Sequence, residues 1–288
     1  MELLQQVKER VSLEWSFFKM PKIFLTIILT AFIQFLHNAA HNFVHHLAGV
    51  FGVYGGPDKM LVDLGFKALD SFPELSTVPN DCLSAIVVIV VLVFFSLLFN
   101  NFFFAKTDLR IMQILFRASI VCSIAVCLRI VSFLVTILPA PAEHCSELEF
   151  NAPDSLTSIL FHFDVGNGCS DLIFSSHMLY GLVATCALTH YLIHGNRGYS
   201  LTKYQRFFKY CLIFAVWFTV LLEGFAMIRQ NRHYSIDVWT SLYAVPFTWI
   251  VVHYFIPSDP VPTCCPTSNG EEENNSLEEF KENTIFSA

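Results

Sequence analysis

Charged side chains are scarce in this sequence. Asp, Glu, Lys and Arg make up 14% of the 288 residues, against about 25% in a typical soluble domain, and 54% are hydrophobic. A disordered chain is excluded because disorder requires low hydrophobicity and high charge. The net charge of −7 disfavours nucleic-acid binding, which normally uses a basic patch. So much apolar surface cannot be hidden from water in a soluble enzyme, and a polytopic membrane protein remains.

The nine cysteines lack the Cys-x-x-Cys pairs of a zinc site, and we expect neither a metal nor a cofactor. Cys145 and Cys169 flank a loop in which both a disulfide and free thiols remain open. Cys264 and Cys265 follow the last apolar segment and are candidates for palmitoylation. Four others lie in apolar runs and are expected to be small core residues: Cys122, Cys127, Cys186 and Cys211.

Six apolar segments each approach the roughly 20 residues that a bilayer core requires. A lipid-exposed strand outside a barrel would leave backbone groups unpaired, so each segment is predicted to be a helix. The sequence therefore predicts an all-α, six-helix transmembrane domain at 23–256, after an N-terminal segment at 1–22 and before a flexible acidic tail at 257–288. The predicted spans are 23–47, 83–100, 111–138, 172–194, 209–228 and 236–256.

Lys and Arg favour one side of this arrangement. Eleven lie in the N-terminal segment, the second–third and fourth–fifth loops and the tail, whereas four lie in the other loops. The loop at 139–171 has none. Because cytoplasmic loops carry the excess of Lys and Arg, we expect both termini in the cytosol and the other three loops in the lumen or exterior.

Two polar clusters lie at the predicted lumenal edge. One, at 169–178, enters the fourth span and includes Asp171 and His177; the other, at 232–237, enters the sixth and includes His233 and Asp237. His233 and Asp237 are four residues apart and so share a face if both are helical. The charge count that set the topology thus places both clusters on one side of the membrane.

These residue types suit displacement at phosphorus without a metal. Asp237 can bind one imidazole nitrogen of His233 and leave the other free as a nucleophile, while His177 can protonate a leaving group. Arginines would hold the phosphate, and the candidates are Arg129, Arg229 and Arg232. A single histidine at a membrane interface is more often an amphipathic anchor; the joint spacing favours catalysis.

Further polar residues have open roles. Asp171 is expected to order its loop, cap the following helix or contact a head group. Tyr234 is expected to line a pocket or anchor the interface. Glu223 lies within the fifth span, where a carboxylate is costly, and is a candidate to pair with Arg129 or bind a head-group hydroxyl.

The first span carries His37, His41 and His45 at four-residue spacing. A metal site is one interpretation, but no carboxylate or cysteine accompanies the stripe. We favour a polar face that lines the substrate cavity or lies near the lumenal interface, where it would suit a polyol such as inositol.

The two clusters resemble a known family. Cys-x-Asp-x-x-x-Ser-x-His at 169–177 and His-Tyr-x-x-Asp at 233–237 resemble the third and fourth motifs of the sphingolipid synthases, within the lipid phosphate phosphatase superfamily. Arg129 followed by 135–139 (Val-Thr-Ile-Leu-Pro) resembles their second motif. His37, His45, Gly55-Gly56-Pro57 and 63–66 (Asp-Leu-Gly-Phe) resemble the plant-type inositol phosphorylceramide synthases. The resemblance covers roughly 30–256.

The sequence also departs from these patterns. Ser176 stands where many members have Gly. Lipid phosphatases of the superfamily usually carry Ser-Arg a few residues before the second His, where this chain has Ala226-Met227. The missing Ser-Arg pair favours a transferase over a hydrolase, although Arg229 can partly substitute for the arginine of that pair.

The resemblance implies transfer of a phospho-head group from a glycerophospholipid to ceramide, with release of diacylglycerol and a phospho-histidine intermediate on His233. The partners implied are these two lipids, and the location is the Golgi or plasma membrane with a lumenal or exoplasmic site. Inositol, choline and ethanolamine remain open as head groups, with a tilt toward inositol, and the oligomeric state is open. A lipid phosphatase and a non-catalytic lipid-binding protein are the alternatives.

Overall fold

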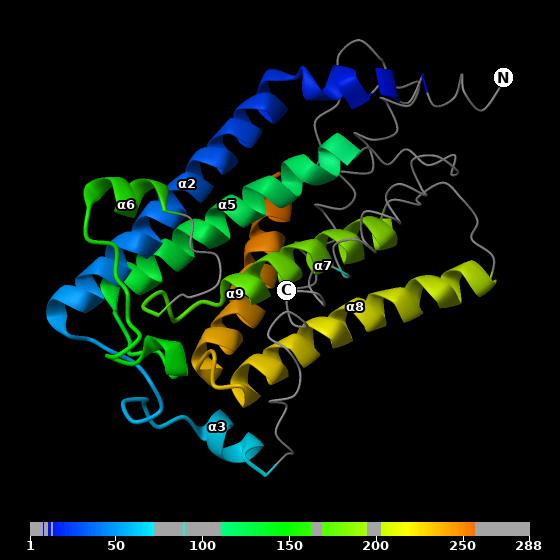
Figure 1. Cartoon of the computed structure of the whole chain (residues 1–288). Helices are drawn as coiled ribbons and strands as arrows, with labels where there is room; N and C mark the ends of the chain where they lie inside the picture. Colours follow the sequence, from blue (N-terminus) through cyan, green and yellow to red (C-terminus); the bar gives the residue numbers. More distant parts are fainter. Residues whose placement is uncertain are drawn as a thin grey trace.

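Every regular element of the described chain is a helix, as the sequence predicted. The computed structural model describes residues 8, 11–12, 14–71, 89, 111–162, 169–194 and 203–256. The long helices carry the fold, and shorter ones lie in the loops at one end (Figure 1). The elements are α2 (Pro21–Phe51), α3 (Leu64–Leu69), α5 (Ile111–Val135), the 3₁₀ helix η2 (Glu143–Cys145), α6 (Leu156–Phe161), α7 (Ser176–His194), α8 (Lys203–Arg229) and α9 (Ser235–Phe255).

Within the described residues, four helices are long and apolar enough to cross a membrane: α2, α5, α8 and α9. They correspond to the first, third, fifth and sixth predicted spans. The fourth predicted span corresponds to α7, which begins at Ser176 rather than 172. This helix is not among the four membrane-spanning candidates, because His177, His190 and His194 reduce its apolar character. The predicted span at 83–100 lies outside the described residues except for Ile89. The count of six spans and the cytosolic termini therefore stay predictions.

Helix ends follow local chemistry. Pro21, at the first position of α2, lacks a donor that the helix could not use there, and Gly52 ends the helix in the left-handed region with φ 66°. The predicted third span ran to 138, but α5 ends at Val135, four residues before Pro139.

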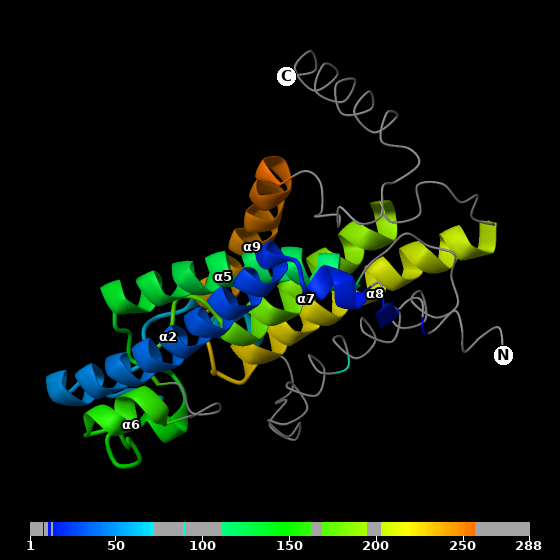
Figure 2. The ribbon, with the colours of Figure 1, turned by 90° about the horizontal axis from the view of Figure 1, so that it is seen from above.

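The core lies where α7 packs on α5, α8 and α9, while α2 runs beside α5 (Figures 1 and 2). Fully buried apolar side chains fill this core, including Val121, Met178, Leu182 and Val245. On α8, a Cβ at Gly224 would lie 2.8 Å from Val238 Cγ1, so this glycine permits the close approach to α9. Large apolar side chains such as Phe32, Phe214 and Phe247 face outward, as lipid contact requires.

The expectation that four cysteines lie in the core is wrong for two of them. Cys186 is buried and Cys122 is half-buried, but Cys127 and Cys211 are exposed. In a membrane helix the lipid-facing side is as apolar as the core, so an apolar run does not reveal which side faces inward.

The loops after α2 and α5 and the segment before α7 form one cap over the end of the bundle. Gly55 N donates to Cys145 O and Gly56 N to Ala140 O, both at 2.8 Å. A Cβ at Gly55 would lie 2.2 Å from Ala140 O, so only glycine fits there. Cys145 and Cys169 form a disulfide, which settles the choice that the sequence left open.

The disulfide is expected to stabilise this cap. It closes a sequence separation of 24 residues, and loop-closure entropy assigns such a crosslink about 3 kcal/mol. Cys145→Ser should lower the thermal midpoint of the detergent-purified protein, whereas Cys211→Ser, at an exposed free thiol, should leave it unchanged. Alkylation of Cys145 and Cys169 in the native protein without a reductant would contradict the bond.

Candidate active site

His233 and Asp237 form a directly bonded pair at the start of α9. His233 Nδ1 lies 3.1 Å from Asp237 Oδ2, and since a carboxylate only accepts, Nδ1 carries the proton and Nε2 keeps a lone pair. The sequence argument placed both residues on one helix face, but α9 begins at Ser235. The pair forms instead because Asp237, in the first turn, reaches back to His233 and to Tyr234 N at 3.0 Å.

The carboxylate of Asp237 is fully buried and also accepts from Ile173 N at 2.8 Å. Ile173 has φ 79°, a left-handed conformation that is a genuine outlier for a β-branched residue. Such strain persists where surrounding contacts enforce it, and it often marks functional sites. Nothing in the residue types of 169–178 predicted this conformation.

His177 lies in the first turn of α7, which is tied to the first turn of α9. Ser175 N donates to Asp237 O at 3.4 Å, and Ser241 Oγ donates to Ser175 O at 3.3 Å. Ile173 N donates to Asp237, so the two predicted clusters meet there, and the charges that act on His177 include those of His233, Arg129 and Arg232. The Nδ1 atom of His177 is buried and has no hydrogen-bond partner among the described residues.

Arg129 reaches this place from α5 and is almost completely buried. Its Nη2 is ion-paired with Asp171, and its Nε donates to His37 Nε2 at 2.9 Å. Its Nη1 has no partner among the described residues and is therefore available to an anion.

Asp171 is a partner of Arg129 rather than a helix cap. His41 Nδ1 also lies 3.2 Å from its carboxylate. Burial opposes ionisation of this carboxyl, but the positive charge of Arg129, followed by that of His41, outweighs it and holds the pKa well below its ordinary value. Of the three roles left open by the sequence, ordering the loop fits best, because the bonds fix this loop against α5 and α2.

The other predicted binding residues lie in different surroundings. Arg232 is half-buried and its charge acts on His177, whereas Arg229 is the last residue of α8. Glu223 is buried on α8 against Gly181 and forms no ion pair with Arg129, whose carboxylate partner is Asp171. One oxygen of Glu223, Oε1, has no hydrogen-bond partner among the described residues.

The side chain of Tyr234 forms its contacts within the cap. Its hydroxyl donates to Pro139 O at 2.8 Å and accepts from Leu61 N at 3.0 Å, and its ring stacks on Phe66 at 5.6 Å. Both functions of the hydroxyl are thus used within the protein, and Tyr234 joins three loops instead of facing a ligand with its oxygen.

Sequence reasoning missed the role of Asp63. It caps α3 by accepting from Gly65 N at 2.7 Å, and it accepts from Ser235 N and Ser235 Oγ, both at 2.7 Å. A Cβ at Gly65 would lie 1.8 Å from Ser235 Oγ, so glycine is required beside this contact. Partial burial would raise the pKa of Asp63, but the hydrogen bonds lower it overall. An Asp two residues before a Gly at a helix start was the available signal.

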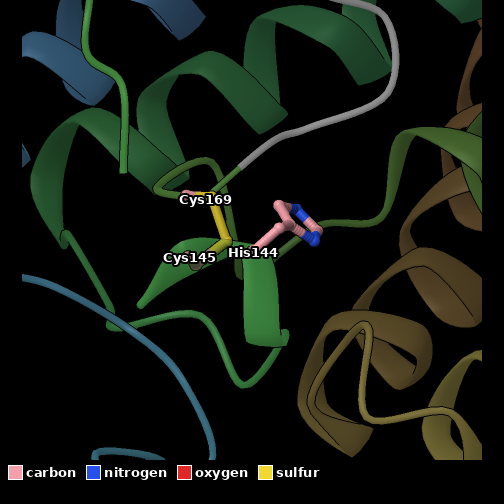
Figure 3. Close-up of side chains that lie close together, drawn as sticks. All are labelled: His144, Cys145 and Cys169. Atoms are coloured by element: carbon pink, nitrogen blue, oxygen red, sulfur yellow. A yellow bond between two sulfur atoms is a disulfide. The ribbon is translucent and has the colours of Figure 1, made fainter. Parts of the chain in front are cut away.

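The three histidines of α2 contact different residues. His37 contacts Arg129, His41 contacts Asp171, and the ring of His45 stacks on Phe150 at 4.4 Å. His144 lies close to Cys145 and Cys169, but the two sulfurs are bonded to each other and offer no thiolate (Figure 3). His37 and His41 therefore contact the arginine and the carboxylate of the candidate site.

Two histidines, a buried carboxylate and a buried arginine make up this candidate site. Residues 168–254, which contain His177, His233 and Asp237, match the family described as PAP2 superfamily C-terminal. The resemblance to the sphingolipid synthases, within the lipid phosphate phosphatase superfamily, is confirmed by the relatives that follow.

Those relatives are phosphatidylinositol:ceramide inositolphosphotransferases of plants. The one from Oryza sativa subsp. japonica is 27% identical over 234 residues, which are 79% of this chain and 64% of the relative. In Arabidopsis thaliana, inositolphosphotransferase 3 is 26% identical over 262 residues (86% and 82%), and inositolphosphotransferase 2 is 29% identical over 235 residues (79% and 68%). The chain spans just under two thirds of the length of the rice relatives.

The contact between Asp63 and Ser235 should be measurable as stability. Asp63→Ala removes the acceptor of Ser235 N and Oγ, and for a half-buried carboxylate we expect a loss of about 1–2 kcal/mol and a lower thermal midpoint in detergent. Asp58→Ala, at an exposed carboxylate of the same loop, is the control. Equal midpoints for both variants would contradict the assigned role.

Proposed function

We propose that this membrane protein is a phosphotransferase that moves phosphoinositol from phosphatidylinositol to ceramide and releases diacylglycerol. The observation that carries the proposal is the His233–Asp237 pair, which lies with His177 and Arg129 at the end of the bundle. The similarity to plant phosphatidylinositol:ceramide inositolphosphotransferases extends over about four fifths of the chain and supports the choice of substrates.

The chemistry proceeds by two displacements at one phosphorus. In the first, the lone pair of His233 Nε2 forms a bond to phosphorus, the bond to the diacylglycerol oxygen breaks, and His177 protonates that oxygen. In the second, His177 removes the proton of the ceramide primary hydroxyl, whose oxygen attacks phosphorus and expels His233. Asp237 stabilises the cationic imidazole, and Arg129 Nη1 holds a phosphate oxygen.

Transfer rather than hydrolysis requires that water be kept from the phosphorylated histidine. In the lipid phosphatases the region before the second histidine usually carries Ser-Arg; here Ala226 and Met227 are buried in α8, with Met227 Sδ 3.5 Å from Ser175 Oγ. This position is apolar and packed, which supports a transferase over the lipid phosphatase alternative.

The location and the outer segments belong to the same proposal. We place the site on the lumenal or exoplasmic face of the Golgi or plasma membrane, with the catalytic domain at 23–256 and cytosolic segments at 1–22 and 257–288. The palmitoylation candidates Cys264 and Cys265 lie outside the described residues. Ceramide and the donor glycerophospholipid are the proposed partners, and self-association stays open.

Substitution of the histidines should stop transfer. Membranes that express the protein are given fluorescent ceramide with phosphatidylinositol, phosphatidylcholine or phosphatidylethanolamine in turn. His233→Ala removes the nucleophile and should abolish the new phosphosphingolipid, whereas His177→Ala should slow its formation by about 10²–10⁴-fold. His190→Ala, on α7 but in contact with His253 and Trp249, is the matched control and should retain activity.

Two results would overturn the proposal. Product formation by His233→Ala at the wild-type rate would rule out a phospho-histidine intermediate on His233. No product with any donor, together with phosphate release from ceramide phosphate or phosphatidic acid, would make the protein a lipid phosphatase.

The orientation has its own test. Ser155→Asn creates a glycosylation acceptor sequence with Thr157 at the exposed start of α6, in the loop predicted to be lumenal. This variant should gain a glycosidase-sensitive sugar in cells, while the natural acceptor sequence at Asn274 should stay unmodified in the wild type. A sugar on Asn274, or none on the variant, would reverse the assigned topology.

A further inference from the structure

A second polar region lies beside the phosphate site, by which we mean the candidate active site around Arg129, His177 and His233. It is a cavity of about 700 Å³, between α2, α6 and the segment from 144 to 154. We call it the loop cavity. His41, Asn42 and His45 of α2 form its buried inner end, and the carboxylates of Glu149 and Asp154 lie at its exposed rim. Its volume falls within the range of about 300–1,000 Å³ that is typical of ligand pockets.

The loop cavity and the phosphate site share a wall. His41 lines the cavity, and its Nδ1 lies 3.2 Å from Asp171, which in turn is ion-paired with Arg129. One hydrogen bond and one ion pair therefore separate the cavity from the unpartnered Nη1 atom of Arg129. The cavity and Arg129 are therefore neighbours, and a ligand that occupied both would have its phosphate at Arg129 and its next group in the cavity.

The lining selects among head groups. None of its described residues is Lys or Arg, so the cavity offers no cation to a second phosphate. None is Phe, Tyr or Trp, so it lacks the aromatic faces that a trimethylammonium group requires.

The remaining chemistry is that of a ring polyol. The cavity presents imidazoles from His41, His45, His144 and His162, the amide of Asn151 and the carboxylates of Glu149 and Asp154. Hydroxyl groups both donate and accept, so a ring with several of them can bond to carboxylates, imidazoles and amides together.

We propose that the loop cavity binds the hydroxylated ring of the donor head group and selects phosphatidylinositol over choline lipids. This inference rests on the proposed function. Arg129 takes the phosphate and the loop cavity takes the ring, which orients the bond to diacylglycerol toward His177. Head-group choice thus lies with residues of the 144–162 segment and α2, and the phosphoryl chemistry with α7 and α9.

The test uses the full-length protein in nanodiscs and two soluble probes, glycerophosphoinositol and glycerophosphocholine. We expect the wild type to bind the inositol probe at least tenfold more tightly. Glu149→Gln should weaken that binding and raise KM for phosphatidylinositol about tenfold with kcat unchanged, the loss of one hydrogen bond to a charged acceptor. Asp154→Asn should act in the same direction.

Glu147→Gln is the matched control. Glu147 lies two residues from Glu149 in the same loop and does not line the cavity. Its side chain is 66% exposed and forms an ion pair with Lys59. This variant should leave the binding of both probes and KM unchanged. Thermal midpoints of all three variants are compared with the wild type to exclude unfolding.

The outcomes separate the inference from the proposed function. Selective binding of the inositol probe that Glu149→Gln weakens, without ceramide product, would support the cavity and overturn the transferase. Normal product formation with KM unchanged in Glu149→Gln and Asp154→Asn, or equal binding of both probes, would overturn the cavity assignment and leave the transferase intact.

Discussion

The buried carboxylate of Asp237 is the contact on which the arrangement of the site depends. It accepts from His233 Nδ1, Tyr234 N and Ile173 N, and these groups belong to the segments that precede α9 and α7. A fully buried charge is tolerated only when donors surround it. The same requirement therefore orients His233, begins α9, and holds the strained Ile173 and the start of α7 against it.

A second buried charge joins the remaining helices to this centre. Arg129 of α5 and Asp171 form an ion pair to which α2 adds His37 and His41. Desolvation offsets most of the attraction in such a pair, so its contribution lies less in stability than in a fixed geometry. Among the described residues, that geometry leaves Nη1 of Arg129 without a hydrogen-bond partner, and in the proposed function a phosphate oxygen would supply the acceptor.

The sequence predicted which residues make up the candidate site because its chemistry depends on residue types, and their catalytic roles stay a prediction. The clusters at 169–178 and 232–237 lie together as expected, and the choice of helices followed from the apolar runs. The sequence-based prediction failed where the position of a residue depends on contacts with a distant segment of the chain. The contact of Asp63 with Ser235 joins residues 172 positions apart, the left-handed Ile173 follows from a bond to Asp237, and Tyr234 bonds to two distant loops. The exposure of Cys127 and Cys211 depends on which side of each helix faces lipid.

The absence of Lys and Arg from 139–171 has two consequences that reinforce each other. It is the pattern of a loop that leaves the cytosol, and it also leaves the loop cavity without a basic side chain. Among the described residues, Arg129 and Arg232 are the arginines whose charges act on His177. In the function proposed above, the same charge pattern favours a phosphate at the arginines and the uncharged part of a head group in the loop cavity.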